Sequence, residues 1–160
     1  MRKRANTRRL SRQIVNFFQA QGCVIVATID RKGSIHTSCK GIVEIDPKGE
    51  ISLFDLYQAG TLRNLRKNSH ITITALDEHT FQGYSLKGTA RVLMRDDVPD
   101  HTHKAWEAQI TGRLTRRVVR NLKDEKGHLK HPEILMPDPE YLIVVDVKEV
   151  IDLRPRHLRE

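Results

Sequence analysis

The side chains of this sequence with the most obvious capacity to bind a metal ion are its clustered histidines. His101 and His103 form one pair, and His128 and His131 form another. No cysteine lies near either pair, and the His-Glu-x-x-His pattern of zinc hydrolases is absent. Two residues apart on a helix, His101 and His103 would point to different faces. We therefore expect no metal site.

Nucleophilic catalysis also lacks a signature. Cys23 and Cys39 lie in strand-like runs with no neighbouring base, which favours burial over reactivity. Residues 83–88 are glycine-containing but lack the Ser or Thr and the helix start of a phosphate-binding loop, and no Gly-x-Ser-x-Gly motif occurs. With two cysteines in the chain, a disulfide framework is excluded as well. No catalytic residue can be named from spacing.

The segment that begins at Thr61 suggests a different chemistry, the binding of a phosphate. Thr61 follows Gly60 as a candidate N-cap of a helix of roughly two turns that ends near Asn68. A helix N-terminus presents unpaired N–H groups and the positive end of its dipole to an anion. Arg63 would add a guanidinium and Asn64 an amide. The same residues also fit a plain cap and a solvated cation, and spacing does not separate the two interpretations.

The net charge of +8 is concentrated at the N-terminus. Residues 1–12 hold six of the 28 basic residues and no acidic one, which leaves 22 basic against 20 acidic residues elsewhere. Such an arm can contact a polyanion or remain a solvated end. We expect a basic arm over residues 1–12, a single domain over 13–153 and a frayed Arg-rich tail over 154–160.

The hydrophobic pattern predicts short strands joined by tight turns. Helical spacing from Leu10 to Phe18 predicts a short amphipathic helix that ends near Gly22. Strands are predicted at 23–29, 34–46, 50–56, 71–76, 83–94 and 141–152, with turns at 30–33 and 46–49. Gly41 and Gly88 are candidates for bulges or bends within their strands.

A long helix is predicted near 98–122, followed by a charged, proline-containing surface loop over 123–139. The helix would carry an apolar stripe formed by Trp106, Ile110, Leu114, Val118 and Leu122. The first three strands have no helices between them, which excludes a doubly wound parallel sheet. Six antiparallel strands bent by glycines close naturally into a barrel without exposed edges. We predict a mainly β fold, a six-stranded antiparallel barrel with added helices.

The order of these elements resembles the FMN-binding split-barrel family, whose best-known member is pyridoxamine 5'-phosphate oxidase. The resemblance rests on IVATIDRKG at 25–33, IHTS at 35–38, GEISLF at 49–54, TLRNLRKN at 61–68 and YSLKGTARV at 84–92. It covers residues 10–95 well and the remainder by element order. It implies a six-stranded split barrel that forms a homodimer, with two FMN molecules in clefts between the subunits.

Carried over by position, the resemblance also implies nine cofactor contacts. Those that would line the flavin from the second strand are Thr37, Ser38, Cys39 and Lys40. Those that would border the ring system from the end of the third strand are Phe54 and Asp55. Those that would hold the phosphate are Thr61, Arg63 and Asn64.

The sequence departs from the oxidase itself at several positions. Ile35 stands where relatives often have proline, and Ser38 stands where the oxidase has an arginine near the phosphate. The oxidase's C-terminal Arg-x-His pattern has no counterpart here, because Arg154 to Arg159 is only superficially similar. The resemblance therefore implies FMN binding more strongly than vitamin B6 oxidation.

The leading functional interpretation is a small FMN-dependent oxidoreductase of unknown substrate, in which the flavin does the redox chemistry and the protein orients it. The long helix and the 123–139 loop would set substrate selectivity. The alternatives are a non-catalytic flavin or redox sensor and a split barrel that holds deazaflavin or haem. A nucleic-acid-binding barrel acting through the basic arm is disfavoured by the 5% aromatic content. No apolar run reaches the roughly 18 residues of a membrane span, and no signal segment follows the basic start, so we expect a cytoplasmic protein.

Overall fold

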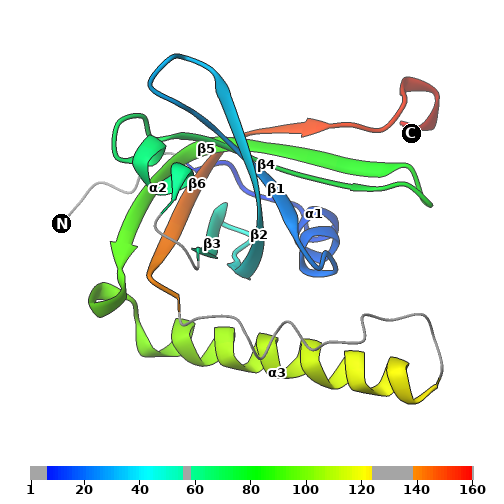
Figure 1. Cartoon of the computed structure of the whole chain (residues 1–160). Coiled ribbons are helices and arrows are strands. Elements are labelled where there is room, and N and C mark those ends of the chain that lie inside the picture. The colour runs from blue at the N-terminus through cyan, green and yellow to red at the C-terminus, as the bar shows by residue number, and fades with distance from the viewer. Residues whose placement is uncertain (1–6, 56–58, 124–138, 160) are drawn as a thin grey trace.

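The computed structural model describes residues 7–55, 59–123 and 139–159 (Figure 1). In chain order the elements are α1 (Arg12–Gln19), β1 (Val24–Ile29), β2 (Ile35–Ile45), β3 (Glu50–Asp55), α2 (Gly60–Leu65), β4 (His70–Asp77), β5 (Gln82–Met94), α3 (Asp100–Leu122) and β6 (Tyr141–Asp152). Short 3-10 turns lie at Arg95–Asp97 and Arg156–Leu158. The predicted loop over 123–139 falls almost entirely outside the described residues.

The strands form a closed barrel in the order β1-β2-β3-β6-β5-β4, and every neighbouring pair is antiparallel. The predicted six-stranded barrel with added helices is therefore confirmed. Consecutive strands pair along β1-β2-β3 and β4-β5. The last strand, β6, is inserted between β3 and β5, which joins the two halves. Figure 1 shows α3 running along the lower side of the barrel. The short helix α2 contacts β1, β2 and β5.

Two irregularities bend the long strands. In the ladder between β5 and β6 the register shifts between Lys87 and Gly88, at the predicted glycine, and the extra residue, Lys148, lies on β6. A Cβ at Gly88 would lie 2.2 Å from the carbonyl oxygen of Asp146, so only glycine allows this approach. In β2 the shift falls between Ile42 and Glu44 rather than at Gly41. Gly41 instead lies beneath α3.

The barrel interior is filled by alternate residues of every strand, such as Val26, Leu53, Ile73 and Leu86, each no more than 1% exposed. A smaller apolar cluster lies outside the barrel, between β3, β6 and α3, and consists of Phe54, Val98, Leu142 and Val144 with Trp106 packed against it.

The predicted apolar stripe of α3 is covered only along the first half of the helix. Trp106, Ile110 and Leu114 are partly buried, whereas Val118 is 38% and Leu122 80% exposed. The helix contacts β2 through its first half, where Gln109 donates to the carbonyl of Ile42. Arg113, just past the middle of the helix, donates to the carbonyl of Gly22. Beyond it, Val118, Val119 and Leu122 are exposed.

The N-terminal segment is attached to the barrel from its first described residues. The backbone N–H of Arg8 donates to Val147 and that of Leu10 donates to Pro47, each at 2.8 Å. The hydroxyl of Ser11 caps α1 by accepting from Ile14 at 3.3 Å. The predicted short helix is confirmed, although it ends at Gln19, before Gly22.

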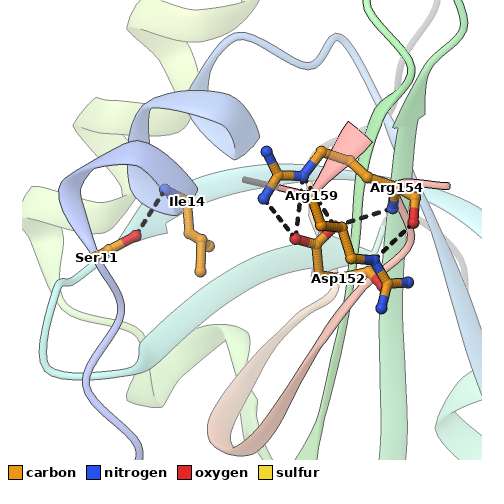
Figure 2. A network of polar contacts seen from close by, with 5 residues as sticks. All are labelled: Ser11, Ile14, Asp152, Arg154 and Arg159. Carbon is orange, nitrogen blue, oxygen red and sulfur yellow. Dashed lines mark hydrogen bonds and ion pairs between the residues drawn. The ribbon is translucent and has the colours of Figure 1, made fainter. Parts of the chain in front are cut away.

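The C-terminal tail is held by an arginine network rather than frayed (Figure 2). The Arg154 guanidinium donates to both carboxylate oxygens of Asp152, with the shortest distance 2.7 Å. Arg159 then donates to the backbone carbonyls of Asp152 and Arg154, at 2.8 and 2.7 Å. These contacts hold residues 154–159 at the end of β6.

The Arg154 contact predicts a measurable acid titration. The hydrogen bonds from Arg154 lower the pKa of the Asp152 carboxyl below its ordinary value. Because the folded-state pKa is depressed, the pair stabilises the protein above the unfolded pKa of about 3.9, and this contribution is lost as pH falls through the folded pKa. Arg154→Gln should raise the Asp152 pKa, measured by NMR titration of the carboxyl carbon. Arg156→Gln is the matched control, and equal Asp152 titrations in the two variants would contradict the assignment.

Candidate functional site

The helix α2 is fixed to the barrel by two side-chain hydrogen bonds. The hydroxyl of Thr61 lies 3.1 Å from that of Ser38 on β2. The amide of Asn64 donates to the hydroxyl of Thr28 on β1 at 3.0 Å. Thr61 and Asn64 are 2% and 8% exposed, and their spacing of three residues places both on the face toward the barrel. The predicted cap is wrong: Ala59 is the N-cap, and Thr61 uses its hydroxyl across the interface instead.

Arg63 lies on the opposite side of α2 and is exposed. Residues two apart on a helix do not share a face, so the three predicted phosphate ligands do not converge through their side chains. Thr61 and Asn64 turn inward, and Arg63 turns toward solvent. Of the three, Arg63 presents its side chain where an anion in solution can reach it.

A histidine that the sequence did not single out packs against the start of α2. His36 is half-buried on β2, on the same side of the strand as Ser38. A Cβ at Gly60 would lie 2.8 Å from Cε1 of the His36 ring, so any larger residue here would displace the imidazole from its present position. In the sequence, the pair Gly60-Thr61 marked the start of this helix, but nothing indicated that His36 lies against Gly60.

Lys40 and Asp55 form a buried ion pair inside the barrel. The ammonium of Lys40 is 2.5 Å from the carboxylate of Asp55, and both side chains are at most 9% exposed. The hydroxyl of Tyr141, which is fully buried, donates to the same carboxylate. Burial, followed by the contact with Asp55, raises the pKa of the Tyr141 phenol, so it remains a hydrogen-bond donor. Lys40 and Asp55 therefore satisfy each other within the protein.

Tyr141 is a site residue that the sequence did not reveal. It is 86 residues from Asp55 in sequence but directly opposite it in the ladder between β3 and β6. The contact between Tyr141 and Asp55 could be identified only from the order of the strands in the barrel. Its position as the first residue of the last predicted strand was the sole local signal.

Phe54 and Asp55 face opposite sides of β3 because successive strand residues alternate. Phe54 packs outside the barrel, with its ring centroid 5.7 Å from His103 and 5.4 Å from Trp106. The structure therefore separates the two predicted neighbours of the flavin ring: Asp55 lies inside the barrel and Phe54 lies under α3.

Alternation also divides the predicted contacts on β2. Ser38 and Lys40 point inward, whereas Thr37 and Cys39 are exposed on the outer face. The expected burial of the cysteines is wrong, since both Cys23 and Cys39 are free and exposed. The outer face also carries Ile25, which lies opposite Cys39 in the ladder and is 51% exposed. Thr37, Cys39 and Arg63 are the predicted contacts that solvent reaches.

Within the described ranges, no three His, Cys, Asp or Glu side chains gather as a metal site. Nor does any helix in that part of the chain have the length and apolarity to cross a membrane.

The fold and this arrangement define a six-stranded split barrel with a pinned helix beside β1 and β2. The family model described as pyridoxamine 5'-phosphate oxidase matches residues 10–152, so the chain belongs to the pyridoxamine 5'-phosphate oxidase family. The resemblance seen in the sequence is confirmed.

Solved structures share the fold at low identity. A conserved hypothetical protein from Mycobacterium tuberculosis, Rv2991, has a TM-score of 0.64 at 19% identity, over 99% of this chain and 92% of the other. A Clostridium acetobutylicum protein of the pyridoxinephosphate oxidase family, related to general stress protein 26 of B. subtilis, has 0.60 at 17%, over 94% and 93%. A protein described as an F420 reductase has 0.51 at 13%, over 81% and 88%. No curated protein matches the chain.

The buried pair predicts a strongly non-additive mutant cycle. Lys40→Met leaves the Asp55 carboxylate buried without its cation, and we expect a loss of about 3–5 kcal/mol in the free energy of unfolding, measured by urea denaturation. Lys40→Met/Asp55→Leu should recover part of that loss, because no unpaired charge remains.

The matched control is Lys87→Met, which breaks a pair that is about half exposed. That change should cost about 1 kcal/mol or less. Equal losses for Lys40→Met and Lys87→Met would show that the inner pair is not desolvated as described.

Proposed function

We propose that this protein is a flavoprotein oxidoreductase that binds FMN and acts as a homodimer. Membership of the pyridoxamine 5'-phosphate oxidase family supports the proposal. The arrangement around α2 supports it further, because an exposed cation lies on a helix that contacts both β1 and β2. When bound, FMN would supply hydride or electron transfer, and the chain would bind and orient it.

The exposure of the Arg63 side chain is the observation that most directly supports FMN as the cofactor. Its side chain is exposed on a helix that Thr61 and Asn64 hold against the barrel, so the guanidinium extends from a fixed backbone. A guanidinium binds phosphate through parallel charge-assisted hydrogen bonds. In this proposal Arg63 holds the FMN phosphate, and Thr37 and Cys39 lie along the flavin from the outer face of β2.

The inward-facing residues of the predicted site fit a supporting role. Lys40 is paired with Asp55, and Asn64 donates to Thr28, so their polar groups already have partners. Phe54 packs beneath α3. We propose that these residues, with Ser38 and Thr61, position α2 and the strand ends and do not themselves touch the cofactor. The Arg that the oxidase places near the phosphate is Ser38 here, which leaves Arg63 as the exposed cation among the nine predicted residues.

The outer face supports the homodimer. Ile25 on β1 lies opposite Cys39, and Leu76 lies on the same face of β4, two residues beyond Thr74, the partner of Ile25. Ile25 and Leu76 are 51% and 61% exposed. Apolar side chains that join into a larger patch mark interaction sites, and a second copy placed here would bring Ile25 and Leu76 into one apolar interface.

A deazaflavin is the second candidate cofactor. The fold is shared with a protein described as an F420 reductase, and Arg63 would suit the phosphate of either cofactor. Parallel titrations with FMN and F420 separate the two, because the cofactor that fits should bind at least about tenfold more tightly.

The Arg63 assignment predicts a loss of FMN binding in Arg63→Ala. We expect the wild-type protein to retain a flavin absorbance spectrum after addition of FMN and desalting. Arg63→Ala should weaken binding by about tenfold or more, measured by quenching of flavin fluorescence, since a charged hydrogen-bond partner is lost. Arg120→Ala removes an exposed arginine from α3 and should bind as the wild type does. A wild-type protein that fails to retain FMN would overturn the cofactor proposal.

The homodimer predicts a change of mass on substitution of the outer face. Light scattering coupled to size exclusion should give a dimer for the wild type and a monomer for Ile25→Lys/Leu76→Lys, because a lysine in an apolar interface must be desolvated. Val118→Lys/Leu122→Lys on α3 is the matched control and should remain dimeric. A monomeric wild type at micromolar concentration would contradict the homodimer.

A further inference from the structure

A pocket opens on the outer face of the barrel where β1 and β4 part. The two strands pair only through residues 25–27 of β1 and 72–74 of β4. Beyond the last pair, Ala27 with Thr72, the strands diverge toward Ile29 and His70, and the gap is part of a pocket of about 440 Å³. This volume lies in the range of small-molecule sites.

The lining of the pocket is apolar at one end and charged at the other. Ile29 on β1 and Ile35 on β2 line one end and are 38% and 77% exposed. Lys87 on β5 and Lys148 and Glu149 on β6 line the other end. The strands follow one another as β2-β1-β4-β5-β6 around the barrel, so the two ends are separated by β4. At the usual spacing of about 4.8 Å between strands, the pocket spans roughly 14–19 Å.

The charged end has a net positive charge, since two lysines face one glutamate there. The Lys87 ammonium lies 3.4 Å from Glu149, and both side chains are about half exposed, at 49% and 54%. A pair this exposed contributes little to stability, so either partner can exchange it for a ligand group. The charged end therefore favours an anion, while the isoleucines favour an apolar body.

We propose that this pocket binds an elongated organic anion, with its apolar body over β1 and β2 and its anionic group over β5 and β6. The proposal does not rest on flavin binding, because neither Arg63 nor Thr37 is among the described residues that line the pocket. One lining residue, Thr28, connects the pocket to α2 by accepting the hydrogen bond from Asn64.

The test uses 4-phenylbutyrate, an apolar ring joined by a short chain to a carboxylate, and its neutral counterpart 4-phenyl-1-butanol. Dissociation constants are measured with the full chain by calorimetry, and the site is located by NMR shifts of assigned backbone amides. The acid should bind about five- to tenfold more tightly than the alcohol and should shift amides on both β1 and β5.

Substitutions at each end should act differently. Lys87→Gln/Lys148→Gln should weaken the acid by about fivefold or more and leave the alcohol unchanged. Ile35→Asp places a charge at the exposed apolar end and should weaken both compounds. Lys48→Gln/Lys104→Gln removes the same charge from exposed positions outside the pocket and should change neither constant.

Three results would overturn the proposal. Equal binding of acid and alcohol would mean that the charged end has no role. Binding of neither compound to folded protein would mean that the pocket is not a small-molecule site. Displacement of 4-phenylbutyrate by FMN would assign the pocket to the cofactor instead. The experiment uses protein without bound FMN. Its result therefore does not depend on whether the protein retains FMN.

Discussion

The closure of the barrel between β1 and β4 is the constraint on which the rest of the structure depends. Both strands are long enough for a longer ladder, but only three residues of β1 pair with three residues of β4. Beyond that ladder the sheet opens. The side chains of Thr28 and Ser38, on the inner side near this opening, are then bonded by α2 rather than by another strand. The position of α2, the exposure of Arg63 and the outer pocket all follow from where this ladder ends.

Much of the fold could be predicted because its signals are local. Turns are marked by Gly33 and Gly49, both of which adopt positive φ, and the bend at Gly88 is marked by a glycine within a strand. The strand bounds follow from apolar runs between such breaks. The bulge in β2 was misplaced because a glycine within a strand also serves close packing, and Gly41 lies against Arg113 of α3.

The site was harder to predict because its geometry is not local. Family resemblance places residues in order along the chain, but strand alternation decides which of them reach solvent. Thr37 and Lys40 are three residues apart and face opposite sides of β2. The partner of Asp55, Tyr141, became visible only once β6 was known to pair with β3. The inner Lys40–Asp55 pair also removes a lysine from the set that could meet an anionic ligand, which no count of charges along the sequence would reveal.

The exposed thiols have a practical consequence for studies of this protein. Cys39 lies on the outer face of β2, and Cys23 immediately precedes β1. No other cysteine occurs in the chain, so replacing Cys23 with serine leaves a single native attachment point on that face. A nitroxide or fluorophore joined to Cys39 would then report the approach of a neighbouring subunit or ligand without the introduction of a new cysteine.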